Sequence, residues 1–410
     1  MIDASRLLSD PKLARLLAAL AATGCESRVV GGAVRDALLG VEPHEIDIAT
    51  AALPEAVARA AKAAGLKAVP TGLAHGTVTV VVEGTPFEVT TLREDVETYG
   101  RAAKVRFGAD FEQDALRRDF TVNAMSLSPD GRLYDYVGGQ ADLRRRRIRF
   151  IGDPATRIAE DYLRVLRFFR FHAAIGEGPL DPQGLRAAIL ARDNLKLLSR
   201  ERIRTELLKL LVARRAAATV REMTQAGIIE ILLGMAYPAR LDRFIAIEAT
   251  RNAPPDPIAR LAALAVLVRE DAERLRERLR LSNVEYTRLA LAAALVEELH
   301  GRDGRFSAQE LNMMLFFHGR VADALALAHA DHADPPDDAC WLDAAKFIIE
   351  TDPPAFPVKG ADLVARGVAP GRALGAALKR LQANWIRAGF PRDPRRVLQL
   401  LEDVAPNGGD

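Results

Sequence analysis

Two acidic residues near the start of the chain could hold a metal ion together. Glu45 and Asp47 are separated by one residue in the segment Glu45-Ile46-Asp47-Ile48. A strand here would send both carboxylates to one face, because successive side chains of a strand alternate. Carboxylates that close raise each other's pKa unless a cation lies between them, and hard divalent cations prefer such oxygen ligands. The pair predicts a metal site, although a solvated strand surface is the commoner setting for any single acid.

A pair of glycines precedes these acids and predicts a phosphate site. Gly31 and Gly32 follow the apolar residues 29–30 and lead into a helical segment, 33–39. Glycine has no Cβ, so backbone N–H groups at the start of that helix could approach a phosphate closely. The N-terminus of a helix also favours negative charge. The glycine turn would thus place a phosphate beside the paired acids.

The elements that must position these residues change in character near residue 140. Alternating apolar residues predict strands, and a 3.6-residue period with caps predicts helices. In the first part, strands are expected at 27–30, 45–50, 77–82 and 87–92, and helices at 11–22 and 54–64. The polar segment 94–110 is expected to be a mobile loop. Beyond residue 150 helix follows helix, which predicts a small mixed α/β head on a long α-helical body.

Length and composition narrow the class of protein. With 410 residues, the chain is long enough for several folded modules. Its hydrophobic content of 49% excludes global disorder. A net charge of +2 limits any nucleic-acid surface to a local patch. Cys25 and Cys340 are the only cysteines, which favours a reducing, cytoplasmic compartment. No apolar run reaches the roughly 18 residues of a membrane span, so no membrane is expected as a partner.

Three motifs, in their order along the chain, resemble the class II tRNA nucleotidyltransferases, the family of the CCA-adding enzymes and the bacterial poly(A) polymerases. They are residues 31–36 with 45–50, residues 117–125 and residues 160–167. Three ordered motifs are far more specific than any one alone. The resemblance implies an α/β head of the nucleotidyltransferase type, a mixed β-sheet with helices, followed by an all-α neck, body and tail. The expected parts are a catalytic head at 1–140, a neck at 141–215, a body at 216–335 and a tRNA-binding tail at 336–410.

The resemblance also implies the chemistry of the paired acids. In nucleotidyl transfer a 3′-hydroxyl attacks an α-phosphorus while pyrophosphate leaves, and two metal ions can assist both events. Glu45, Asp47 and Glu88 are implied as catalytic acids, with Glu45 and Asp47 as ligands of Mg²⁺. The family usually has aspartate at the first position. Glu45 keeps the negative charge, but its side chain is one methylene longer.

Two further groups of residues are implied in nucleotide binding. The triphosphate would lie on Gly31, Gly32 and Arg35, and the ribose 2′-hydroxyl on Arg118, Asp119 and Asn123. Residues 117–125 are expected to form a helix with an apolar stripe that leaves these three polar residues on other faces. The structural alternatives are a surface ion pair between Arg35 and its neighbour Asp36, and an Asp-to-Asn hydrogen bond across one helical turn.

The third motif implies selection of the base without a nucleic-acid template. A helix that begins at Pro154, with Asp153 as its N-cap, is expected to continue through residue 169. On it, Asp161 and Arg164 would offer an acceptor and a planar donor fork to cytosine or adenine, with Arg167 in support. Ordinary salt bridging along the helix is the alternative reading of the same residues.

Other polar residues receive weaker interpretations. A helix after Ser199 is expected to brace the base-selecting helix, with Arg202 and Glu206 exposed. His75, at a strand entrance, is either structural or close to the active site. The basic run 144–147 and the glycine-rich segment 359–372 could each meet RNA phosphates or be plain surface. Four residues are interpreted as a polar loop rather than a metal site: His329, Asp331, His332 and Asp334.

The sequence therefore predicts template-independent addition of C and A to the 3′ end of tRNA. CTP and ATP would be the substrates and Mg²⁺ the cofactor, with no protein partner implied. A poly(A) polymerase shares the head and neck but usually carries a basic run after the neck helices, which this chain lacks. A C-only or A-only enzyme would carry the same motifs. A helical RNA-binding protein with a degenerate head, or an enzyme acting on a small molecule, fits the nearly complete site and the long helical body less well.

Overall fold

The computed structural model describes residues 4–72, 76–99, 102–108, 110–332 and 335–402. His75 and Asp334 lie outside these residues. The chain divides into two compact units, Met1–Gly234 and Met235–Asp410. Within the described ranges, no helix is both long and apolar enough to cross a membrane.

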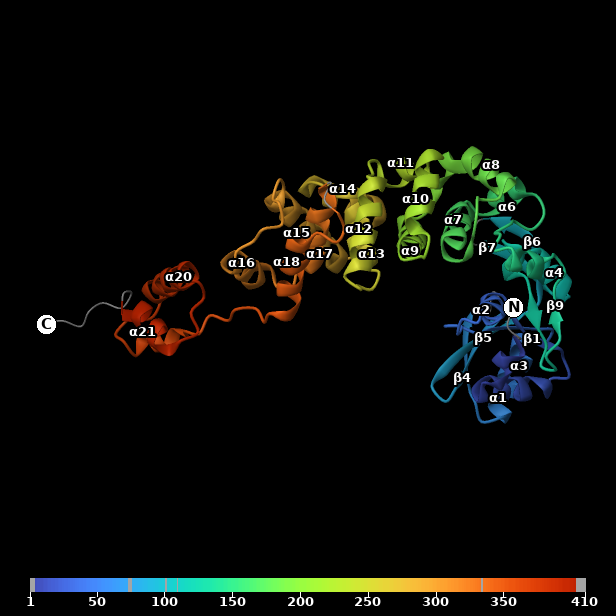
Figure 1. The fold of residues 1–410 in the computed structure, drawn as a ribbon. Helices are drawn as coiled ribbons and strands as arrows, with labels where there is room; N and C mark the ends of the chain where they lie inside the picture. The colour runs from blue at the N-terminus through green and yellow to red at the C-terminus, as the bar shows by residue number, and fades with distance from the viewer. Residues whose placement is uncertain (1–3, 73–75, 100–101, 109, 333–334, 403–410) are drawn as a thin grey trace. The chain divides into compact units, whose positions relative to one another are not determined.

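A seven-stranded mixed sheet forms the centre of the first unit, which confirms the predicted α/β head (Figure 1). Its strand order is β3-β4-β5-β2-β1-β8-β9. The strands are β1 Ser27–Val30, β2 Asp47–Thr50, β3 Lys67–Gly72, β4 Thr77–Val82, β5 Thr85–Thr91, β8 Ser126–Leu127 and β9 Leu133–Tyr134. The first three α-helices are α1 Pro11–Ala21, α2 Gly32–Leu39 and α3 Pro54–Ala63, after a short 3₁₀ helix at Ala4–Ser9. β2 pairs antiparallel with β1 and parallel with β5, so segments far apart in sequence meet at β2.

The predicted mobile loop at 94–110 is wrong for most of its length. Strands β6 Arg93–Tyr99 and β7 Ala102–Phe107 form a separate antiparallel pair. The charges of this segment suggested a loop, but it also carries Val96, Thr98 and Tyr99, residue types that favour strands. A two-stranded ladder pairs the backbone groups on the facing sides of the two strands.

The predicted helix at 117–125 is also wrong. Helix α4 Phe111–Leu116 ends before it, and only a 3₁₀ turn at Thr121–Asn123 follows. The backbone of Phe120 is extended and bridges Phe150, while the Thr121 N–H donates to the carbonyl of Arg149 at 3.0 Å. Pairing with a segment some thirty residues away thus overrides the local helical pattern.

The predicted helix from Pro154 to residue 169 exists as two helices. Asp153 caps α6 Pro154–Glu160 as expected, but Asp161 is extended at φ −156° and ψ 108°. Helix α7 Leu163–Ile175 then begins anew, and the Asp161 carboxylate accepts the Leu163 N–H at 3.1 Å. A short acidic side chain that binds the backbone locally competes with the helical pattern, which explains the break.

The remainder of the first unit is helical. It comprises α5 Gly139–Arg144, α8 Pro182–Ala191, α9 Arg200–Leu211, α10 Ala216–Gln225 and α11 Ile228–Leu233, with a 3₁₀ helix at Arg192–Leu197. Helix α9 starts after Ser199 as predicted and packs against α7. The prediction that Glu206 is exposed is wrong, because its carboxylate is buried beside arginines of α7.

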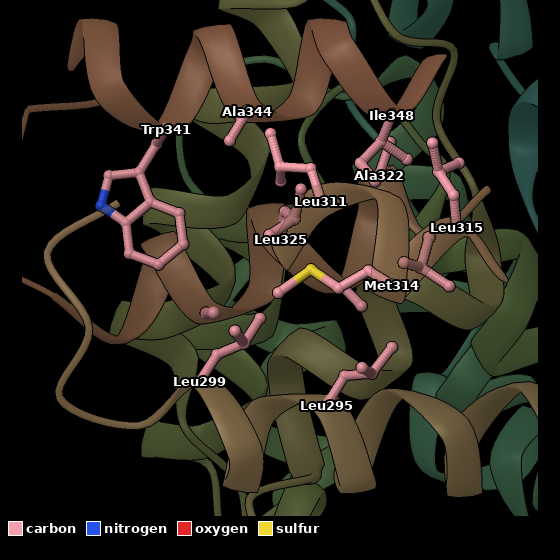
Figure 2. Packing of buried hydrophobic residues seen from close by; sticks show 13 residues of the cluster. Leu295, Leu299, Leu311, Met314, Leu315, Ala322, Leu325, Trp341, Ala344 and Ile348 are labelled. Atoms are coloured by element: carbon pink, nitrogen blue, oxygen red, sulfur yellow. The ribbon is translucent and has the colours of Figure 1, made fainter. Parts of the chain in front are cut away.

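The second unit is all-α, as predicted. Its helices are α12 Pro238–Thr250, α13 Pro257–Ala265, α14 Arg269–Leu279, α15 Asn283–Leu299, α16 Ala308–His318, α17 Ala322–Asp331, α18 Ala339–Glu350, α19 Gly360–Val364, α20 Arg372–Arg387 and α21 Pro394–Glu402. Figure 2 shows leucines of α15 and α16 packed with Trp341 and Ile348 of α18 in one core. His329 and Asp331 lie on α17 rather than in a polar loop, and the ring of His329 stacks on Trp341 at a centroid distance of 5.4 Å.

Candidate active site

A cavity of about 450 Å³ in the first unit brings the three motifs together. The predicted residues that line it are Gly32, Arg35, Asp47, Arg118, Asp119, Asn123, Asp161, Arg164 and Arg167, and they are joined by Arg117 and Phe171. Residues separated by more than a hundred positions thus share one space. Gly31, Glu45 and Glu88, the other predicted residues, lie outside the lining.

Strand pairing places two of the predicted acids side by side. Asp47 is the first residue of β2, and in the parallel pair of β2 with β5 its register partner is Glu88. Both residues are exposed. Partial desolvation raises the pKa of Asp47, and the carboxylates of Glu88 and Glu45 raise it further, against the opposing effect of Arg118. Mutual repulsion of this kind is what a bound cation would relieve.

Glu45 departs from the predicted arrangement. The strand begins at Asp47, so Glu45 precedes it and is not held by the ladder. It is exposed and still close enough to affect the pKa of Asp47. Among the described residues, no group of three or more His, Cys, Asp or Glu side chains is arranged to hold a metal ion.

The glycine turn leads directly into α2, as the sequence suggested. Gly31 has φ 73° and ψ −126° and is the N-cap residue of α2. A Cβ at this position would lie 2.6 Å from Nη1 of Arg118, which is far inside van der Waals contact. The positive φ favours glycine at position 31, and a Cβ there would also displace the end of the Arg118 side chain.

Arg35 connects the glycine turn to the second motif. Its Nε and Nη2 donate to the two carboxylate oxygens of Asp36 at 2.8 and 3.0 Å, so the predicted ion pair is present. Its Nη1 donates to Oδ1 of Asn123 at 2.6 Å. A guanidinium held by two partners is fixed in direction while part of its donor set stays free for a phosphate.

Both carboxylate oxygens of Asp119 accept hydrogen bonds from other protein groups. Oδ1 accepts the Phe120 N–H at 2.9 Å and Nδ2 of Asn123 at 3.2 Å, and Oδ2 accepts Nε of Arg167 at 2.6 Å. Burial alone would raise the pKa of Asp119, but the guanidinium of Arg167 outweighs it and holds this pKa below its ordinary value. The hydrogen bond between Asp119 and Asn123, foreseen as the structural alternative, is therefore present.

Sequence reasoning missed Asp114. Its buried carboxylate accepts hydrogen bonds from Arg117 through Oδ1 and from Arg118 through Oδ2, the latter at 3.0 and 3.1 Å. One acid on α4 thus orients two arginines that line the cavity. The available signal was the spacing, because an aspartate followed by arginines at i+3 and i+4 lies on one helical face.

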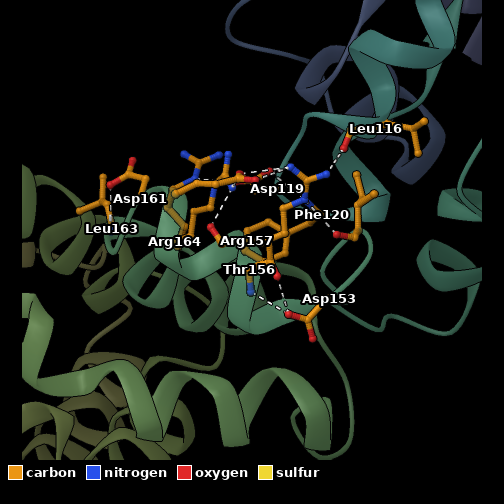
Figure 3. A network of polar contacts seen from close by, with 12 residues as sticks. Leu116, Asp119, Phe120, Asp153, Thr156, Arg157, Asp161, Leu163 and Arg164 are labelled. Atoms are coloured by element: carbon orange, nitrogen blue, oxygen red, sulfur yellow. Dashed lines mark hydrogen bonds and ion pairs between the residues drawn. The ribbon is translucent and has the colours of Figure 1, made fainter. Parts of the chain in front are cut away.

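The break between α6 and α7 separates the polar residues of the third motif, and Figure 3 shows Asp161 and Arg164 on either side of it. Arg164 donates through Nη1 to the carbonyl of Arg157 at 2.8 Å and also pairs with Glu160. Asp161 is instead paired with Arg202 of α9, whose Nη2 lies 2.6 Å from Oδ2. Asp161 and Arg164 therefore do not neutralise each other, and both line the cavity with partners of their own.

Three arginines lie around the ring of Phe171, and two of them, Arg35 and Arg167, line the cavity together with Phe171. The guanidinium carbons of Arg35, Arg167 and Arg170 lie 5.1, 5.2 and 4.0 Å from the ring centroid. The buried Glu206 of α9 pairs with Arg170 and lies 3.9 Å from Nη1 of Arg167. The result is a cationic wall that is held by one aromatic face and one buried acid.

Comparisons with known proteins agree with this arrangement. A family model described as the poly A polymerase head domain matches residues 27–149. A second, described as the probable RNA and SrmB-binding site of polymerase A, matches residues 180–238. The human mitochondrial CCA tRNA nucleotidyltransferase 1 is 33% identical over 381 residues, which cover 92% of this chain and 86% of that protein. The CCA-adding enzyme of Limosilactobacillus fermentum is 31% identical over 95% of this chain and 96% of its own length.

Solved structures give the same result. The crystal structure of the Bacillus stearothermophilus CCA-adding enzyme in complex with CTP has a TM-score of 0.74 and 26% identity, and covers 98% of both chains. The Thermotoga maritima CCA-adding enzyme complexed with tRNA has a TM-score of 0.69 at 23% identity, a likeness of fold.

Asp119→Asn is expected to destabilise the first unit. The change removes the nearer of two buried acids beside Arg167 and leaves Glu206 at 3.9 Å, which should lower the free energy of unfolding by about 1–3 kcal/mol near neutral pH. The pKa of Asp119 is below its ordinary value of 3.8 in the folded protein. The parent protein is therefore more stable than the variant by the full amount above pH 3.8, and this difference in stability is lost as the pH falls through the lowered pKa. Denaturant unfolding from pH 7 down to pH 3 measures this difference.

The matched control is Asp193→Asn, which removes an exposed acid paired with Lys196. It should leave the unfolding curve nearly unchanged. Equal effects of the two substitutions, or an Asp119 effect that grows as the pH falls, would contradict the assignment.

Proposed function

Since this chain belongs to the family of CCA-adding tRNA nucleotidyltransferases, we propose that the 450 Å³ cavity is where it adds C and A to the 3′ end of tRNA. CTP and ATP are the substrates, pyrophosphate is the second product, and no nucleic-acid template is used. One observation carries the assignment of the site. Residues of all three motifs, supplied by the glycine turn, the 3₁₀ turn and the α6–α7 junction, line the same cavity.

We propose Glu45, Asp47 and Glu88 as the catalytic acids, with Glu45 and Asp47 as the ligands of Mg²⁺. The donor set fits this ion, because Mg²⁺ usually binds one or two protein carboxylates and completes its shell with water and substrate phosphates. Two facts support the fit: the Asp47–Glu88 register and the raised pKa of Asp47 beside its acidic neighbours. When bound, the ion would promote ionisation of the attacking 3′-hydroxyl and neutralise the leaving pyrophosphate.

The triphosphate would lie over the glycine turn. Gly31 and Gly32 leave the start of α2 open to an anion, and Arg35 and Arg118 supply positive charge beside it. Asn123 and Arg118 are proposed to meet the ribose. Asp119 is proposed to act mainly as a positioning residue, since its oxygens already accept hydrogen bonds from Phe120, Asn123 and Arg167.

Base selection is assigned to Asp161 and Arg164. Each is oriented by a separate partner, Arg202 for Asp161 and Glu160 for Arg164, so the pair can present an acceptor and donors to one base edge. Arg167 would support them from α7. A preformed edge of fixed hydrogen-bonding groups can favour cytosine and adenine over uracil and guanine, whose exocyclic groups have reversed polarity at the corresponding positions.

Two broader proposals accompany the site. The first is the division into a head at 1–140, a neck at 141–215, a body at 216–335 and a tRNA-binding tail at 336–410. The second is a cytoplasmic location, supported by the two free cysteines, Cys25 and Cys340. The named relatives include mitochondrial proteins, so fractionation of the native host is the direct test of location.

Poly(A) addition is the second candidate, because the model that matches the head is named after poly A polymerase. The discriminating experiment supplies tRNA transcripts that end before CCA, after the first C and after both Cs. Each is incubated with Mg²⁺ and with CTP, ATP or both. Ordered addition that stops at CCA is expected. Continued addition of A on varied RNAs would establish a poly(A) polymerase. Addition of C alone or of A alone would establish a split-activity enzyme.

Asp47→Asn should reduce nucleotide addition by at least about 10²-fold, since loss of one charged group that stabilises the transition state typically costs that much. Binding of tRNA in the absence of Mg²⁺ should be unchanged. Single-turnover addition of C measures the rate. The control is Glu55→Gln, an exposed acid on α3. Retention of near-parental activity by Asp47→Asn would remove Asp47 from the catalytic acids.

Arg164→Ala should relax the choice of base more than it slows the reaction. Removing one half of the donor and acceptor set is expected to reduce discrimination for CTP over UTP by roughly 10²-fold. Incorporation of each of the four nucleotides, measured separately as kcat/KM, gives the ratio. Arg186→Ala, an exposed arginine on α8, is the control. An unchanged CTP-to-UTP ratio in Arg164→Ala would refute the assignment.

A further inference from the structure

A second cavity, of about 540 Å³, lies in the first unit and shares no lining residue with the active site. It is bounded by α5 and the segment after it on one side and by the start of α8 on the other. Its charged and polar lining residues are Asp142, Arg145, Arg147, Arg149, Asp181 and Gln183. Three of these six are arginines, which is the residue type best suited to a phosphate.

Two of the arginines are anchored by acids beneath the cavity surface. Arg147 pairs with Asp181, and Nε of Arg149 donates to Oδ2 of Asp142 at 2.9 Å. Both acids are buried, whereas the side chains of Arg147 and Arg149 are each about two-fifths exposed. A guanidinium has five N–H donors, so these ion pairs fix its plane and still leave donors for a ligand.

Arg145 supplies the uncompensated charge. Its side chain is exposed, and within the described part of the chain no hydrogen bond or ion pair involves its guanidinium. The lining therefore carries three guanidinium groups against two carboxylates. The N-terminus of α8 lies at the same wall, but the Asp181 carboxylate already caps it by accepting the Gly184 N–H at 2.9 Å, so the excess positive charge rests on Arg145. A cavity with this charge should attract an anion.

We propose that this cavity is a second, non-catalytic site that binds a backbone phosphate of the RNA substrate. Phosphate contacts fix the register of a nucleic acid on a protein without reading its sequence. Residues that line this cavity are also hydrogen-bonded to the 3₁₀ turn of the active site. Asp142 accepts the Thr121 hydroxyl at 2.6 Å, and the carbonyl of Arg149 accepts the Thr121 N–H at 3.0 Å, at the turn that carries Asn123.

The same contacts decide which residue to change. Substitution of Arg149 would disturb the support of Thr121, and substitution of Arg147 would leave the buried Asp181 without its cation. Arg145 has no such structural partner. Arg144, one position earlier, carries the same charge, is exposed and does not line the cavity, so Arg144→Ala is a matched control.

The experiment measures equilibrium binding of a tRNA transcript that lacks CCA to the full-length protein between 50 and 200 mM salt. Nucleotide and Mg²⁺ are omitted, so the result does not depend on the proposed catalytic roles, although the inference rests on the action of this family on tRNA. If Arg145 neutralises one phosphate, Arg145→Ala should lower the slope of log affinity against log salt by about one. The advantage of the parent over this variant should then shrink roughly threefold across that range.

A second arm separates RNA from free phosphate, which has the same oxyanion chemistry. Binding of inorganic phosphate to the protein alone is titrated at constant ionic strength. The expected set of results is a reduced salt slope for Arg145→Ala, little change for Arg144→Ala and a slope restored by the charge-retaining Arg145→Lys. Equal slopes for the two alanine variants would overturn the proposal, because general surface charge would then account for the effect. Phosphate binding that depends on Arg145 while RNA binding does not would overturn the assignment to RNA.

Discussion

The buried ion pair between Asp119 and Arg167 is the interaction on which the site depends. It joins the segment just before the 3₁₀ turn of the second motif to α7 of the third, across 48 residues. From Asp119 a continuous set of hydrogen bonds passes through Asn123 to Arg35 at the glycine turn. A charge buried to this extent is tolerated only with a close partner, so neither helix nor turn can shift without the other. The parts of the cavity proposed to bind phosphate and to select the base are therefore connected by one set of hydrogen bonds.

The fold class and most of the residues that line the cavity could be predicted from the sequence. Strands with alternating patterns, such as Thr77–Val82, and helices with clear caps, such as Pro11–Ala21 after Asp10, lie where local signals placed them. Local signals failed where tertiary contacts replaced them. Residues 117–125 have a helical pattern, but the pairing of Phe120 with Phe150 holds the backbone extended. The helix from Pro154 breaks because Asp161 binds the adjacent backbone and reaches Arg202.

Partners of charged residues were the least predictable feature. Asp161 and Arg164 are three positions apart, a spacing that suggests a pair, yet each binds a different residue. Glu206 was expected on a surface and is instead the buried acid between two arginines of α7. Asp114 carried a readable signal, because its two arginines follow at i+3 and i+4. Spacing along one helix can predict such a pair, whereas spacing alone does not identify a partner on a distant helix.

The parallel pairing of β2 with β5 has a consequence for synthesis of the chain. Asp47 and Glu88 become neighbours only through the register of these two strands, and a slip of one residue would turn one of the acids to the opposite face. In a ribosome-bound chain, Glu88 cannot lie beside Asp47 until residue 91 has emerged and β5 has paired with β2. The proposed catalytic centre thus cannot exist in an incomplete head, and nucleotide turnover would report that the sheet has closed correctly.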